Sequence, residues 1–272
     1  MKHKFQFASG IMAFIGLAVI ISACEKDVVA NQQPSPTPVA TSASFVEEFN
    51  NVGDLSAKGW VMKNNSQPIG QTGWRQGRYE SASQQQYKFL GPVPFLGFPA
   101  YSASTSPNDF VSCDATVVND AVTGSGEISA WLISPELPIK NGDKIIFLTR
   151  AVDDALYGWY SKDRMQVRAN FSNDGSADVG NTPTSTGRFT NVLADINPKY
   201  IFNDPSGNTP AEVGYPRNWT RVTLTVSGLT APVQKARFAF RYLGTDAGVF
   251  GGTSGDNYPS VVGIDSLAFV QQ

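Results

Sequence analysis

The chain has 272 residues, of which 41% are hydrophobic and 16% are charged, and its formal net charge is −2. This length can bury a sizeable core, and the weak acidity excludes the strongly basic surface that nucleic-acid-binding proteins carry. One histidine, His3, and two cysteines, Cys24 and Cys113, restrict the catalytic and metal-binding chemistry that the chain can perform.

The first 23 residues have the pattern of a secretory signal peptide. A Lys-His-Lys triplet at residues 2–4 precedes an apolar run over residues 11–21, and small residues then lead to Cys24. The apolar run is too short, and its charge too one-sided, for a lasting transmembrane helix. Removal of residues 1–23 would take away Lys2 and Lys4 and change the formal charge from −2 to −4.

The sequence Ile-Ser-Ala-Cys at residues 21–24 resembles the lipobox of bacterial lipoproteins. The resemblance implies cleavage before Cys24 and attachment of lipid to its sulfur and its new amine. Several acyl chains give a lasting membrane anchor because each buried methylene contributes roughly 0.8 kcal/mol. The alternative is an ordinary secretory signal in which the cysteine occurs by chance.

Signal cleavage would leave the mature chain with little reactive chemistry. Loss of His3 excludes a His-dependent triad, a His general base and a His metal ligand. With Cys24 lipidated, Cys113 has no partner for an intramolecular disulfide, and its apolar neighbours predict a buried structural thiol. Arg237 and Arg241, four residues apart in one strand-like run, are predicted to lie on a solvated strand face.

Residues 24–44 are predicted to be a tether that follows the lipidated cysteine. Prolines at 34, 36 and 38 favour extended polyproline II, which makes a semi-rigid spacer. The acidic stretch at residues 25–27 resembles the export signal of surface lipoproteins in some Gram-negative bacteria. It slightly favours surface display at the outer membrane over periplasmic retention.

Residues 45–272 have one character throughout and are predicted to form a single all-β domain. Short alternating runs are separated by turn residues, and period-two alternation indicates antiparallel strands with one packed face and one wet face. The predicted strands are residues 45–49, 127–134, 144–150, 164–172, 219–227, 236–243 and 261–270.

A set of sequence pieces occurs in a fixed order along this domain: residues 45–49 with 59–60, 130–135, 163–167, 215–220, 240–242 and 263–267. This ordered set resembles the choice-of-anchor J family of bacterial surface proteins, which is similar to cleaved-adhesin and MAM domains. The resemblance implies a jelly-roll β-sandwich of two antiparallel sheets, with the first and last strands side by side. It implies no defined ligand, because related modules bind proteins, haem-containing proteins or glycans.

A structural calcium site is one local prediction. Glu47 and Glu48 interrupt the first strand and Asp265 the last, so paired terminal strands would bring these carboxylates together. Similar carbohydrate-binding modules use a first-strand Glu and a last-strand Asp for calcium. The alternative is that one Glu faces solvent while Asp265 caps a turn or pairs with an arginine such as Arg241.

A ligand-binding surface is the other local prediction, over residues 153–163. Aromatic rings beside carboxylates can stack on sugars, or contact a protein, while the acids accept hydrogen bonds. The alternative is that Trp159 packs against the sandwich and its neighbours form a loop. The predicted residues are Asp153, Asp154, Tyr157, Trp159 and Tyr160, with Asp163 nearby.

Together these features predict a non-catalytic cell-envelope lipoprotein that binds a glycan or an envelope or extracellular protein, and not nucleic acid. One alternative is a carbohydrate-active enzyme, a glycoside hydrolase or polysaccharide lyase on a jelly roll, which needs no histidine. The sequence lacks the closely spaced Glu-x-Asp-x-x-Glu strand of common jelly-roll glucanases. Another alternative is a purely structural envelope component.

Overall fold

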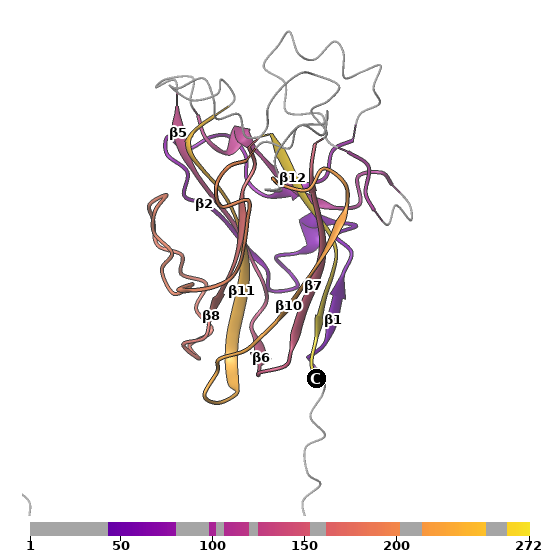
Figure 1. Cartoon of the computed structure of the whole chain (residues 1–272), viewed down its shortest axis with the longest axis vertical. Coiled ribbons are helices and arrows are strands. Elements are labelled where there is room, and N and C mark those ends of the chain that lie inside the picture. Colours follow the sequence, from indigo (N-terminus) through magenta and orange to yellow (C-terminus); the bar gives the residue numbers. More distant parts are fainter. Residues whose placement is uncertain are drawn as a thin grey trace, which may run out of the picture. The chain divides into compact units, whose positions relative to one another are not determined.

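Two antiparallel six-stranded sheets form the protein, which is described by a computed structural model. The structure describes residues 43–79, 98–101, 106–119, 125–152, 162–201, 214–248 and 260–272. The sheets stack as the two layers of a jelly-roll β-sandwich (Figure 1), so the all-β fold predicted from the sequence is confirmed.

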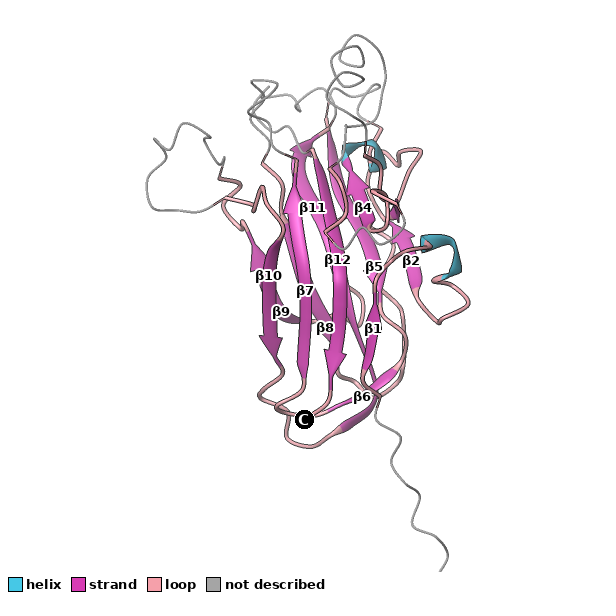
Figure 2. Cartoon of the chain, turned by 90° about the vertical axis from the view of Figure 1, so that its right-hand side faces the viewer, coloured by secondary structure: helices cyan, strands magenta, loops and turns pink. Residues whose placement is uncertain are grey.

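The first sheet, sheet A, is built around β12, the last strand of the chain. The hydrogen-bonded order is β10-β7-β12-β4-β3, and β1 pairs with β12 on the same side as β4 (Figure 2). The expected pairing of the first and last strands is therefore present, with Phe45 opposite Phe269. The strands are β1 (Phe45–Glu47), β3 (Arg75–Gln76), β4 (Val111–Asp114), β7 (Lys144–Ala151), β10 (Thr220–Thr225) and β12 (Val261–Val270).

The second sheet, sheet B, is built around the long strand β11. Its order is β2-β5-β11-β8-β9, and β6 pairs with the first part of β11. Phe238, Phe240 and Tyr242 point from β11 into the sandwich, while Arg237, Ala239 and Arg241 point outward. The strands are β2 (Val61–Asn64), β5 (Gly126–Ile133), β6 (Leu137–Ile139), β8 (Met165–Asn170), β9 (Asn191–Ile196) and β11 (Val233–Ala247).

Sequence patterning found the long strands and missed most short ones. The alternating runs in β5, β7, β10, β11 and β12 were predicted, whereas β2, β3, β4, β6 and β9 were not. Strand β1 ends at Glu47, two residues earlier than predicted. Phe49 adopts a left-handed conformation with φ of 53°, which is incompatible with a continuing strand.

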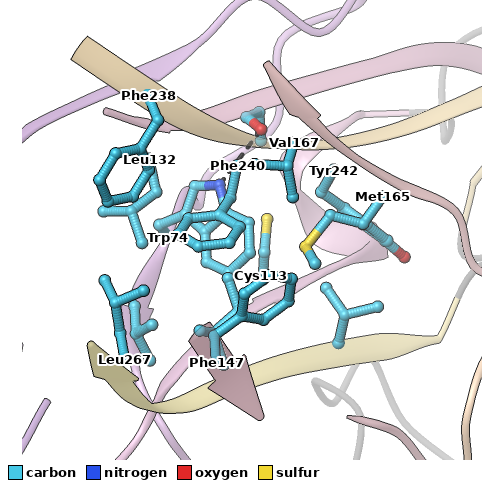
Figure 3. Packing of buried hydrophobic residues seen from close by; sticks show 14 of the residues in the cluster. Trp74, Cys113, Leu132, Phe147, Met165, Val167, Phe238, Phe240, Tyr242 and Leu267 are labelled. Carbon is cyan, nitrogen blue, oxygen red and sulfur yellow. Dashed lines mark hydrogen bonds between the residues drawn. The ribbon is translucent and has the colours of Figure 1, made fainter. Parts of the chain in front are cut away.

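The core between the sheets is apolar and rich in aromatic side chains. Phe147 from sheet A meets Phe240 from sheet B with ring centroids 4.9 Å apart, and Trp74 donates its indole N–H to the carbonyl of Ala130 at 3.1 Å (Figure 3). Cys113 lies among these side chains, fully buried, as predicted for a structural thiol (Figure 3). Burial, followed by the neighbouring charge of Asp114, raises the pKa of its thiol well above the usual value, which removes thiolate reactivity.

The two ends of the sandwich differ in what they carry. At the near end, where β12 finishes, Ala43 is the first described residue and donates its backbone N–H to the Gln271 side chain at 2.9 Å. At the far end, where β12 begins, lie the strand ends that flank four connections, residues 115–125, 152–164, 197–219 and 248–260. The first described residue and these strand ends therefore lie at opposite ends of the sandwich.

Each sheet also has a small apolar cluster on its outer face. On sheet A, Phe98 and Trp219 pack over Gly263, where an added Cβ would lie 2.6 Å from the Phe98 ring. On sheet B, Val179 and Phe189 of the β8–β9 connection pack against Trp131. Both outer faces are therefore partly covered by the chain itself.

Helical structure is confined to two 3-10 turns in the described residues, η1 (Val52–Asp54) and η2 (Ala115–Val117). Across the described ranges, we find no helix with the length and apolar character needed to cross a bilayer.

Candidate functional site

The three acids of the predicted calcium site lie near the point where β1 and β4 stand end to end along β12. We call this set, Glu47, Glu48 and Asp265, the acidic junction. Strand β12 changes register against β7 between Asp265 and Ala268. At this bulge the Ser266 hydroxyl donates a hydrogen bond to the Glu48 carboxylate at 2.9 Å. This bond links the residue after the first strand, β1, to the last strand, β12.

The chain itself supplies partners to the carboxylates of the acidic junction. Lys58 Nζ lies 2.8 Å from Glu47 Oε2, and the Phe49 backbone N–H donates to Glu47 Oε1 at 3.1 Å. Asp265 is fully buried and accepts the backbone N–H groups of Tyr101 at 2.8 Å and Ser266 at 2.7 Å. Such partners offset the cost of burying charged groups.

The fit of these residues to calcium can be judged from their oxygen atoms. Glu47 is paired with Lys58, while Glu48 and Asp265 are the two carboxylates that bond to Ser266 of β12. Calcium takes six to eight oxygen ligands, so carbonyls and water would have to complete the shell. Within the described ranges, no three His, Cys, Asp or Glu side chains form a metal-ligand group. Glu48 and Asp265 fit as a partial ligand set, and calcium stays a prediction.

The predicted glycan-binding residues, Asp153, Asp154, Tyr157, Trp159 and Tyr160, lie outside the described residues, as does Cys24. Their flanks are defined, because β7 ends and β8 begins at the far end of the sandwich.

Asp163, which the sequence groups with those acids, has a structural position. It is buried and accepts hydrogen bonds from the Tyr242 hydroxyl at 2.7 Å and from the backbone N–H of Ser260 at 2.9 Å. Burial raises the pKa of its carboxyl above the usual value, and the hydrogen bonds from Ser260 and Tyr242 oppose that rise. Asp163 thus ties the start of β8 to the start of β12.

The sequence analysis missed a set of arginines on the outer face of sheet B. We call Arg164, Arg168 and Arg241 the arginine face. Arg241 is opposite Gln166 in the ladder, and Arg164 and Arg168 are two residues to either side of Gln166. Diagonal neighbours on one face of a sheet are about 7–8 Å apart, so the three guanidinium groups gather on a small area.

Arg241 is buried, and the prediction of a solvated strand face is wrong for this residue. Its guanidinium lies over the Trp131 ring at 4.9 Å, and it donates to the Ser129 hydroxyl at 3.1 Å and to the Pro183 carbonyl. The β8–β9 connection covers it. Alternation correctly gave the face on which Arg241 lies, but the covering segment comes from a remote part of the sequence.

Within the arginine face, burial and neighbouring positive charges lower the pKa values of Arg168 and Arg241. Burial and the nearby positive charges of Arg168 and Arg164 lower the pKa of Arg241 to about 10. Burial lowers the pKa of Arg168 as well, and the charge of Arg164 adds to this effect. Arg164 differs, because its hydrogen bonds to Asp195 raise its pKa. The surface therefore holds more positive than negative charge.

No family model and no curated protein matches this sequence. Among solved structures, the chain is similar to the K1 cleaved adhesin domain of Lys-gingipain from Porphyromonas gingivalis W83. The identity is 16%, over 85% of this chain and 99% of that one, with a TM-score of 0.46. The K3 cleaved adhesin domain of the same protein gives 14% identity, 85% and 100% coverage, and a TM-score of 0.45.

A third similar structure comes from a study of carbohydrate-binding modules of the β-sandwich superfamily. Its identity is 11%, over 85% of this chain and 64% of that one, with a TM-score of 0.34. Likenesses of this strength concern the fold, and we draw no conclusion about ligand or activity from them.

Proposed function

We propose that this chain is a non-catalytic binding module of the bacterial cell envelope. It is held at the outer membrane by lipid on Cys24, with the domain displayed toward the outside, and it binds a glycan or an envelope or extracellular protein. Membership of the choice-of-anchor J family, on the sequence pieces given above, is part of this proposal.

The arrangement of the sandwich ends is the observation that carries the proposal. The described residues begin at the near end, where Ala43 donates its backbone N–H to Gln271. The connections at the far end include residues 152–164, which hold the predicted aromatic and acidic residues. A module attached at one end and equipped for contact at the other suits capture of a ligand away from the membrane.

The proposed contact residues are Trp159 and Tyr160, supported by Tyr157, Asp153 and Asp154. Large aromatic side chains contribute strongly to sugar and protein binding because they bury much area with little loss of conformational freedom. Calcium at Glu48 and Asp265 would act as a structural ion that stabilises the folded state.

Mass spectrometry of the mature N-terminus tests the anchor. We expect acylated Cys24 as the first residue, and no lipid on a Cys24→Ser variant. Protease treatment of intact cells tests orientation, with degradation of the domain expected for surface display. An unmodified Cys24 in the mature wild-type protein would contradict the anchor.

An array of neutral and acidic polysaccharides tests binding and catalysis together, using the mature lipidated protein in detergent. We expect saturable binding without release of new reducing ends. A Trp159→Ala and Tyr160→Ala double variant should lose that binding, whereas Tyr79→Ala is a matched aromatic control that should keep it. Release of reducing ends from any polysaccharide would favour the enzyme alternative.

A melting experiment tests calcium. We expect added calcium to raise the melting temperature of the wild-type protein after chelation, and to have no effect on Asp265→Ala. An unchanged wild-type melting temperature would contradict the ion site and leave the binding proposal intact.

A further inference from the structure

The outer face of sheet B carries a continuous polar and aromatic row that the proposed function does not use. The row crosses the five strands β2, β5, β11, β8 and β9, each residue lying opposite the next one in the ladder. Its members share one face because cross-strand partners point the same way. From β2 to β9 the row is Lys63, Trp131, Arg241, Gln166 and Asp195. Arg164 and Arg168 flank the row at Gln166.

One carboxylate already bound there shows the chemistry that this surface recognises. Arg164 donates from Nε to Asp195 Oδ1 at 2.9 Å and from Nη2 to Asp195 Oδ2 at 2.7 Å. Gln166 adds a third N–H to Asp195 Oδ2 at 2.8 Å. A planar guanidinium fork matches a carboxylate in this two-bond geometry, which makes such pairs specific as well as strong.

The single carboxylate leaves the arginine face with excess positive charge. Arg168 donates to Gln166 at 2.8 Å and to the Phe189 carbonyl at 2.8 Å, and Arg241 donates to a hydroxyl and a carbonyl. These neutral acceptors satisfy N–H groups without cancelling the charge. Among the described residues, Asp195 is the one acid with a resolved influence on the pKa of both Arg168 and Arg241.

Aromatic rings and a fixed turn hold the arginine face in place. Arg241 lies over Trp131, and Arg164 lies over the Tyr200 ring at 5.3 Å. Tyr200 and Asn197 both have positive φ, at 53° and 60°, and the Asn197 side chain bonds to the backbone of Ile201 in both directions. A strained turn that is locked by its own side chain fixes the ring beneath Arg164.

We propose that the arginine face binds an acidic polysaccharide through a carboxylate or sulfate group. The inference rests on the proposed binding function and names its ligand class. The anion lies between Arg164 and Arg168, where part of the surface reaches solvent, since the side chains of Arg164 and Asp195 are 19% and 25% exposed. Asp195, on the edge strand β9, competes with the ligand for the Arg164 fork.

Competition by Asp195 gives variants with opposite expected effects. Arg168→Gln removes one positive charge and should weaken binding of polygalacturonate about tenfold. Asp195→Asn keeps an oxygen for Arg164 but removes the competing charge, and should tighten binding about fivefold. Arg221→Gln, on the exposed part of β10 in sheet A, changes the net charge as Arg168→Gln does and should leave affinity within about twofold.

The experiment is calorimetric titration of the mature wild-type protein and these variants with polygalacturonate, dextran sulfate and neutral mannan. Binding of polygalacturonate alone assigns a carboxylate ligand, binding of dextran sulfate alone a sulfate ligand, and either result supports the inference. A melting curve for each variant shows whether it is folded. The tightening in Asp195→Asn cannot arise from unfolding.

The outcomes separate this inference from the proposed function. Binding of mannan but of neither acidic polymer would overturn the inference and leave the binding module in place. Acidic-polymer binding that is equally affected by Arg168→Gln and Arg221→Gln would also overturn it, because general charge would then explain the result. Absence of binding to all three polymers would overturn the inference, and the wider polysaccharide array would decide the proposed function.

Discussion

The acidic junction and the arginine face are both charged sites built on a long central strand, but they are neutralised differently. At the acidic junction, Asp265 accepts two backbone N–H groups and Glu47 pairs with Lys58. At the arginine face, Arg164 pairs with Asp195, while Arg168 and Arg241 bond to neutral oxygens. The carboxylates of the junction are thus matched by partners, whereas the arginine face keeps an excess of positive charge.

The position of each site in its sheet explains this difference. The junction lies where short strands β1 and β4 meet along β12, so backbone N–H groups near the break are free to bond a carboxylate. The arginine face lies where β11 and β8 pair without interruption, so the backbone groups between these two strands bond to one another; the β8–β9 ladder changes register between Val167 and Arg168. Side chains there must find partners in the covering β8–β9 connection.

Replacing Trp131 with alanine should have the largest effect on the free energy of unfolding, and it would remove the ring on which Arg241 lies. Trp131 is fully buried, contacts Phe189 with ring centroids 5.8 Å apart and supports Arg241. We expect a loss of about 3–5 kcal/mol in the free energy of unfolding, measured by urea denaturation. Val46→Ala, at an exposed position on β1, should change the stability by less than about 0.5 kcal/mol.

Hydrogen exchange on the same Trp131→Ala variant sharpens the comparison. The backbone N–H groups of Tyr101 and Ser266 should keep their relative protection, because they belong to the acidic junction. Equal loss of protection at both sites would show that the two regions unfold as one unit.

Replacing Asp265 with alanine should have the next largest effect. It leaves the buried N–H groups of Tyr101 and Ser266 without their acceptor, at a cost of about 2–3 kcal/mol. Asp265→Asn keeps an acceptor oxygen and should cost less in the same denaturation measurement. An alanine variant as stable as the wild type would show that the junction does not depend on this carboxylate.

The smallest effect is a pH dependence at Asp195. Burial favours a higher pKa for this carboxyl, but hydrogen bonds from Arg164 and Gln166 outweigh it and the pKa lies below the usual value. A lowered folded-state pKa stabilises the protein above the unfolded-state pKa of about 3.9, and this contribution is lost as the pH falls through the folded-state value.

Urea denaturation of the wild type and Asp195→Asn at several pH values measures this contribution. The wild type should be the more stable near pH 6, and the difference should shrink below about pH 4. Asp163 should show the opposite dependence, because its raised pKa favours the protonated form in the folded state. A difference between wild type and Asp195→Asn that is constant with pH would contradict the role of the Arg164 pair.

The sequence allowed prediction of the sites that depend on the order of elements along the chain. Alternation in β11 and β12 gave their faces, and the resemblance gave the pairing of β1 with β12 that brings Glu48 near Asp265. The short strands β3 and β6 could not be predicted, since two or three residues carry no period. The burial of Arg241 could not be predicted either, because it depends on Pro183 of the β8–β9 connection folding back over β11.

By itself, the sequence determined the signal-like start, the single histidine at residue 3 and the all-β class, because composition and period-two alternation are local properties of the chain. The tertiary structure decided which charges are neutralised. Glu47 meets Lys58 and Arg164 meets Asp195, while Arg168 and Arg241 bond to neutral oxygens, because strand register and the β8–β9 connection bring distant residues together. The pattern within each strand contains no information about those partners.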